Sequence, residues 1–159
     1  MIHEGTHGIQ AMDLLGRKVL MEDGKGLALL AQRMQASMER AASLAGTGEL
    51  GQHAKALGQA LQKVGDATRA TWATGNPHEA LANAVPYLQA FGHTVLAWMW
   101  LDVACTALQK DPSCTHAATT GRLGAARYFF HYELPRIDAW LGVVSTRDTT
   151  CADFPEAAF

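Results

Sequence analysis

The residues whose types and spacing could do chemistry lie near the start of the sequence. His3-Glu4-Gly5-Thr6-His7 fits the H-E-x-x-H pattern, in which two histidines one helical turn apart bind zinc and the glutamate acts as a general base. That chemistry needs a continuous helix across all five residues and a third ligand. Gly5 and Thr6 are instead typical of a helix start, and no later His or Glu stands at a telling spacing. We therefore expect no metal site and no stoichiometric zinc.

The same residues belong to a longer string, HEGTHGIQAMDLLGRK, over positions 3–18. It resembles the Tyr-Glu-Gly-Thr-x-x-Ile-Gln signature of the flavin-dependent acyl-CoA dehydrogenases. Its second half is similar to the subgroup with an extra C-terminal helical domain, which includes the 3-methylmercaptopropionyl-CoA dehydrogenases. Two later segments support that subgroup, PYLQAFG at 86–92 and AARYFF at 125–130. His3 stands where the family usually has tyrosine, and this departure concerns the wall of the substrate pocket, not the base.

The resemblance implies a definite chemistry for this segment. Glu4 would remove the proton next to a thioester carbonyl, while hydride passes from the neighbouring carbon to FAD; a water-poor pocket raises the proton affinity of such a carboxylate. The backbone N–H of Glu4 would stabilise the charge on the thioester oxygen together with a flavin hydroxyl. Gly5 would border the substrate, and Thr6, His7 and Gly8 would contact the cofactor at the helix start. The implied partners are an acyl-CoA, an electron-transfer flavoprotein and further copies in a homo-oligomer.

The resemblance also predicts how the chain is divided. Residues 1–22 would be the end of the catalytic helical domain, and residues 23–159 an additional helical bundle. The family needs three further domains to enclose flavin and thioester, and these 159 residues do not contain them. We therefore expect a C-terminal piece of a dehydrogenase, inactive and without FAD on its own. The alternative is a free-standing helical interaction or oligomerisation module without catalysis.

The elements that must position these residues are helices. Apolar residues recur at helical spacing almost everywhere, and no stretch shows the sustained alternation of a half-buried strand, so the expected fold class is all-α. The sequence predicts helices over about 6–21, 26–45, 49–73, 77–109 and 115–144. Long amphipathic helices joined by short turns favour an antiparallel up-and-down bundle of four long helices, here preceded by one shorter helix.

Several residues set the details of these helices. Thr6 can cap the first helix, whose apolar stripe would be Ile9, Met12 and Leu15. Pro86 is expected near the first turns of the fourth helix or at a kink in it, and Pro135 is expected to bend the fifth. Residues 22–24 would form the first break, and residues 146–159 a frayed tail.

Composition excludes several classes of function. The chain has 13 Lys and Arg against 15 Asp and Glu, a net charge of −2, and no basic stretch, which excludes a nucleic-acid binder that works by phosphate neutralisation. The hydrophobic fraction of 48% excludes intrinsic disorder. The odd count of three cysteines suits no closed disulfide framework, so we expect free thiols in the cytoplasm.

The remaining conspicuous residues have plain structural interpretations. Residues 80–101 contain no Asp, Glu, Lys or Arg, but proline and polar residues interrupt them, so we expect a buried bundle helix without membrane insertion. The aromatic residues follow the helical stripe, and we expect them to serve core and inter-subunit packing: Trp98, Trp100, Tyr128, Phe129, Phe130 and Trp140. Five histidines stand singly, and we expect surface or hydrogen-bonded core positions for them: His53, His78, His93, His116 and His131.

Overall fold

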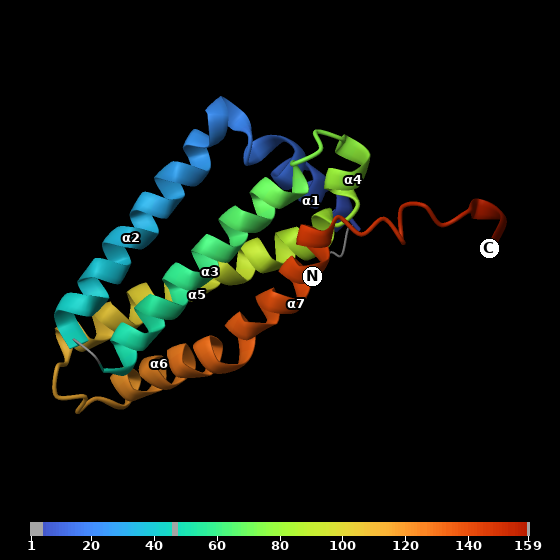
Figure 1. Ribbon diagram of the computed structural model, residues 1–159. Coiled ribbons are helices and arrows are strands. Elements are labelled where there is room, and N and C mark those ends of the chain that lie inside the picture. Colours follow the sequence, from blue (N-terminus) through green and yellow to red (C-terminus); the bar gives the residue numbers. More distant parts are fainter. Residues whose placement is uncertain (1–4, 46–47, 159) are drawn as a thin grey trace.

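The computed structural model describes residues 5–45 and 48–158, and among these residues there are helices and turns but no β-strand. The long elements are α2 (Lys25–Ala45), α3 (Glu49–Thr71), α5 (Ala84–Lys110) and a bent unit made of α6 (Ala117–Tyr128) and α7 (Ile137–Thr146). Consecutive long elements run in opposite directions (Figure 1). The predicted all-α fold class is confirmed.

Short elements precede and join the long ones. The first helix, α1 (His7–Asp13), continues into a π-helical turn, η1 (Leu14–Lys18), and a 3-10 turn, η2 (Met21–Gly24), leads into α2. Glu22, Asp23 and Gly24 all have left-handed backbone conformations, with φ of 48°, 55° and 82°. A helix cannot continue through such residues, so the predicted break at 22–24 is confirmed.

The core of the bundle lies between α3 and α5. Each of these helices contacts the other, and both contact α2 and α7. Alanine is the most frequent buried residue in both helices, and its small side chain lets neighbouring helices approach closely. The buried hydrophobic residues of α3 are Leu50, Ala54, Leu57, Ala60, Val64 and Ala67.

Helix α5 is the one described helix that is long and apolar enough to cross a membrane by length and composition. The core helix of a bundle passes the same test. Here α5 contacts α1, α2, α3, α6 and α7, although one face of it exposes Leu96, Met99 and Val103. Its fully buried residues include Tyr87, whose hydroxyl lies 2.6 Å from that of Thr68 on α3.

The predicted fourth helix is in fact two helices. A short α4 (Pro77–Leu81) ends before Asn83, and α5 begins at Ala84. Pro86 explains the break, because proline lacks an N–H for the carbonyl of Ala82, four residues earlier, and its ring clashes with that carbonyl. In the first turn of α5 the missing N–H costs little. The prediction of one continuous helix over 77–109 is therefore wrong.

The predicted bend at Pro135 is confirmed, and its form is more specific than a kink. Between α6 and α7 the chain passes through a π-helical turn, η3 (Phe129–Glu133), and a 3-10 turn, η4 (Leu134–Arg136). Pro135 cannot donate to the carbonyl of His131, again four residues earlier. The helix widens at that point, as π-helical turns do, and Figure 1 shows the change of direction between α6 and α7.

The stripe predicted for the first helix is only partly correct. Leu15 is fully buried, but Ile9 is 67% exposed and Met12 is 47% exposed. The buried face is instead Ala11, Leu15 and Val19, spaced four residues apart, and α1 and η1 contact α5. The small side chain of Ala11 allows the close approach of α1 that the bulkier Ile9 and Met12 would prevent.

The predicted frayed tail begins later than expected. Helix α7 ends at Thr146, after which Arg147 adopts a left-handed conformation with φ of 54°. The Arg147 guanidinium donates to the carbonyl of Ala70 at 2.8 Å, and the Asn83 side chain donates to the carbonyl of Asp148 at 2.7 Å. These bonds tie residues 147–148 to the bundle, and the following residues run away from it (Figure 1).

Candidate functional site

The structure places part of the predicted N-terminal site. His3 and Glu4 lie outside the described residues, while Gly5, Thr6, His7 and Gly8 lie within them. Gly5 has a left-handed backbone with φ of 63°, and no atom lies within 4 Å of the position that a Cβ would take. Glycine therefore serves the backbone conformation at this position, and none of the described residues beyond its chain neighbours fills the space beside it.

The N-cap residue of α1 does not cap the first-turn amides with its own side chain. Thr6 occupies the N-cap position, but its hydroxyl makes no capping bond to the backbone and instead accepts a hydrogen bond from the Gln10 side chain at 3.2 Å. Thr6 therefore occupies the predicted N-cap position, but its side chain does not make the predicted capping hydrogen bond. Amide N–H groups at a helix start favour an acceptor from outside the helix.

The segment that carries these residues is held to the bundle from one side. The Trp72 indole N–H donates to the carbonyl of Leu15 at 3.2 Å, in addition to the burial of Ala11 and Leu15 against α5. Where η1 meets α2, an apolar groove of about 510 Å³ opens. Its lining includes Leu14, Lys18, Lys25, Leu30 and, from α5, Phe91.

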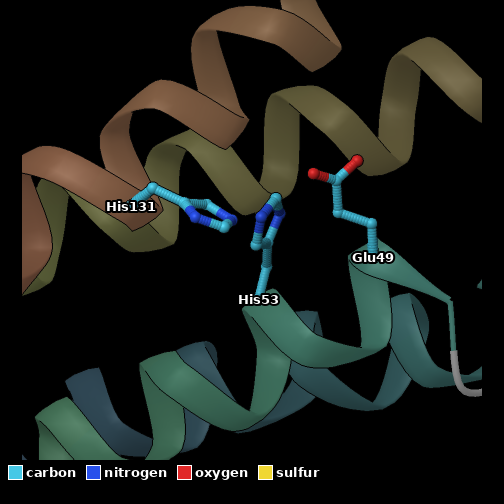
Figure 2. Close-up of side chains that lie close together, drawn as sticks. All are labelled: Glu49, His53 and His131. Atoms are coloured by element: carbon cyan, nitrogen blue, oxygen red, sulfur yellow. The ribbon is translucent and has the colours of Figure 1, made fainter.

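A second group of side chains that could bind a ligand or do chemistry lies at the N-terminal end of α3. Glu49 and His53 stand one turn apart on α3, and His131 reaches them from η3 (Figure 2). One potential ligand atom from each residue lies within 4.8 Å of those from the other two. His53 and His131 stand singly in the sequence and take core and surface positions as expected, His53 being buried and His131 exposed. The fold nevertheless brings them together, because the π-helical turn η3, which precedes Pro135, places His131 beside α3.

Burial and charge set the ionisation of this group. Burial is the main cause that lowers the pKa of His53, and the positive charges of His131 and Arg127 add to it, while Glu49 acts in the opposite direction. Arg127 donates to both carboxylate oxygens of Glu49, one of these bonds being 2.7 Å long. This pairing lowers the pKa of Glu49. At neutral pH the group thus combines a neutral buried imidazole with an ionised carboxylate.

The aromatic residues confirm the packing interpretation in part. Phe129 and Phe130 are buried, and Trp98, Trp100 and Trp140 pack against the core from partly buried positions. Tyr128 is instead 54% exposed, where it stacks on Tyr132.

Sequence reasoning missed the group at Glu49, His53 and His131. The spacing of Glu49 and His53, four residues apart in a predicted helix, was a readable signal that both lie on one face. The contribution of His131 had no such signal. It depends on the π-helical turn and on the packing of α3 against the bent unit.

Comparison with known proteins identifies the family. The sequence pattern of the family described as "Acetyl-CoA dehydrogenase C-terminal like" matches residues 30–155. The chain is 34% identical over 107 residues to the 3-methylmercaptopropionyl-CoA dehydrogenase of Ruegeria pomeroyi, a match that covers 61% of this chain and 16% of that protein. It is 26% identical over 170 residues to the broad-specificity linear acyl-CoA dehydrogenase FadE5 of Mycobacterium tuberculosis, with 99% of this chain and 27% of that protein covered.

The matches thus span 16% of the length of the first relative and 27% of the length of the second. The family pattern begins within α2 and extends beyond α7, so it takes in nearly the whole bundle. The chain belongs to the acetyl-CoA dehydrogenase C-terminal-like family, the C-terminal domain of acyl-CoA dehydrogenases.

Proposed function

We propose that the chain is the C-terminal part of an FAD-dependent acyl-CoA dehydrogenase and that it supplies the catalytic base of that enzyme. The observation that carries the proposal is the order of two features. The motif at positions 3–10 stands directly before a helical bundle of the acyl-CoA dehydrogenase C-terminal family. In this proposal residues 1–22 complete the catalytic helical domain and residues 23–159 form the additional bundle. The left-handed turn at residues 22–24 supports that boundary.

Glu4 acts as the base in this proposal. Its carboxylate takes the proton next to the thioester carbonyl of the acyl-CoA, and its backbone N–H stabilises the negative charge that develops on the thioester oxygen. Gly5 borders the substrate, and the open space that the described residues leave at its Cβ position supports this role. FAD, when bound, supplies the acceptor for the hydride.

Thr6, His7 and Gly8 hold the cofactor in this proposal. The start of α1 supports the assignment, because its first-turn N–H groups suit an oxygen acceptor and the Thr6 hydroxyl does not occupy them. Gly8 also has open space at its Cβ position. The residues present therefore fit a cofactor that approaches the backbone closely.

The partners follow from the same proposal. The exposed side chains of Ile9 and Met12 lie beside these residues on α1, and apolar side chains in such positions suit contact with another domain or another copy. We infer a cytoplasmic homo-oligomer that is not inserted in a membrane and that passes electrons to an electron-transfer flavoprotein. The isolated chain is inactive and holds no FAD.

The test is turnover of the full-length enzyme that contains this chain. Glu4→Gln is expected to lower the rate of dehydrogenation of a saturated acyl-CoA by at least about a hundredfold while FAD content stays unchanged, because the amide keeps the shape and the backbone donor but does not take up the proton. Glu22→Gln, at an exposed position in η2, is the matched control and is expected to keep full activity. Near-normal turnover by Glu4→Gln would remove Glu4 from the role of base.

A further inference from the structure

Glu49, His53 and His131 form a compact group that the proposed function leaves unused. Figure 2 shows the His131 ring and the Glu49 carboxylate on either side of the His53 ring. The potential ligand atoms of the three residues lie within 4.8 Å of one another. Imidazole nitrogen and carboxylate oxygen are ligands that zinc accepts together, and three protein ligands with one open position are a common zinc arrangement.

The His53 ring presents a buried nitrogen without a partner. The residue is only 5% exposed, and its Nε2 makes no hydrogen bond to any described residue. A buried polar atom without a partner is unfavourable, and a metal ion would satisfy it.

The surroundings hold the His53 ring in place and leave a path from solvent. His53 stacks on Phe130 with ring centroids 4.3 Å apart and planes 7° apart. His131 meets it nearly at right angles, with centroids 6.2 Å apart. His53 is buried, Glu49 is half-buried and His131 is exposed, so an ion can arrive from the His131 side and reach the fixed ring.

We propose that Glu49, His53 and His131 form a binding site for a divalent transition-metal ion of the Zn²⁺ class that clamps α3 to the turn between α6 and α7. Ligands of a tetrahedral ion with bonds of about 2.0–2.1 Å lie roughly 3.4 Å apart. The two more exposed side chains, Glu49 and His131, therefore move inward by about an ångström, while the stacked His53 stays in place. The site is independent of the chemistry proposed for Glu4.

Arg127 opposes this binding. It donates to both oxygens of Glu49 and places a positive charge beside the site. The ion must take one of these oxygens from Arg127, whose side chain is 63% exposed and can turn into solvent. Glu49, Arg127 and His131 are the charged or titratable groups that act on His53. Arg127 thus sets the affinity, and its removal should strengthen binding.

The experiment is calorimetric titration of the purified, metal-free chain with Zn²⁺ and, separately, with Co²⁺, whose visible spectrum reports its ligands. The wild-type chain is expected to bind one ion. His131→Ala, a change at an exposed residue, is expected to weaken binding at least about tenfold, and His53→Asn is expected to do the same. Arg127→Gln is expected to tighten binding severalfold. Circular dichroism checks that each variant is folded.

Two matched controls separate this site from other histidines. His116→Ala changes an exposed histidine at the start of α6, and His7→Ala removes the one described histidine of the N-terminal H-E-x-x-H pattern. Both are expected to bind zinc as the wild type does. Binding that survives His131→Ala, binding that is lost on His7→Ala, or less than one ion per chain would overturn the proposal.

Discussion

The segment α1–η1 and the bundle that it rests on use their apolar residues in different ways. In the bundle, α3 and α5 have neighbours on several sides and bury residues along their whole length. The segment buries Ala11, Leu15 and Val19 on one side and leaves Ile9 and Met12 exposed on the other. The bundle thus encloses a core of its own, although α5 also exposes Leu96 and Met99, whereas the segment packs through one face and exposes two large apolar side chains on the other. In the function proposed above, the segment carries the site and the bundle supports the segment.

The largest effect is expected in the bundle. Leu57 on α3 is fully buried, and Leu57→Ala leaves a cavity that rigid neighbours fill poorly, so the free energy of unfolding should fall by about 2–5 kcal/mol. Urea denaturation of the purified chain measures it. Leu29→Ala, at a leucine of α2 that is 54% exposed, is the control and should change stability by less than about 0.5 kcal/mol. Equal effects of the two changes would mean that the bundle is not packed as described.

A change in the segment should act locally. Leu15 is the fully buried residue that holds η1 to the bundle, and Leu15→Ala is expected to release α1 and η1 while α3 and α5 stay folded. Hydrogen exchange should show protection of residues 8–18 falling at least about tenfold, with unchanged protection in α3. A uniform loss of protection across the chain would show that the segment and the bundle unfold as one unit.

The loop between α5 and α6 gives a smaller, pH-dependent effect. Asp111 accepts hydrogen bonds from the backbone N–H groups of Thr115 and His116, at 3.1 and 2.9 Å. The bond from His116 is the main cause that lowers the pKa of Asp111 from 3.8 to about 2. A lowered carboxyl pKa stabilises the fold above the unfolded value, so this contribution is complete above about pH 4 and is lost as the pH falls towards 2.

Asp111→Asn should therefore reduce stability at pH 7 and flatten the loss of stability between pH 4 and pH 2. Thermal unfolding at a series of pH values measures both. Asp23→Asn, at an exposed position in η2, is the control and should keep the wild-type profile. An unchanged profile for Asp111→Asn would show that the carboxylate does not hold the start of α6.

The smallest effect is expected on the exposed face of the segment. Ile9 is 67% exposed, so Ile9→Ala should change the stability of the isolated chain by less than about 0.5 kcal/mol. Urea denaturation of the variant and of the wild type measures this difference in the free energy of unfolding. A loss above about 1 kcal/mol would mean that Ile9 packs in this chain as a bundle residue does, and the contrast between the two regions would disappear.

The sequence predicts the helices well because their apolar spacing and turn residues are local features. The stop at residues 22–24 and the bend at Pro135 are examples. It predicts less well where packing decides between alternatives. Ile9 and Met12 are the stronger apolar residues of α1, yet the smaller Ala11 faces α5, because the distance between the helices decides which side chain fits.

The two candidate sites also differ in how far the sequence alone predicts them. The motif at positions 3–10 is contiguous, so it could be read directly, and its roles come from a resemblance that the family match over residues 30–155 supports. The group at Glu49, His53 and His131 depends on a contact between distant parts of the chain. Pro135 predicts a bend, but no single residue predicts that the bend takes the form of a π-helical turn that places His131 beside α3.

The most direct test of the central claim is a single turnover of the full-length enzyme without oxygen. When an acyl-CoA is mixed with the wild type, proton removal by Glu4 permits reduction of the flavin, and the flavin absorbance should disappear rapidly. Glu4→Gln should bind the same acyl-CoA and retain its flavin absorbance over the same interval, because the proton is not removed. Loss of the absorbance in Glu4→Gln at the wild-type rate would contradict the assignment of the base.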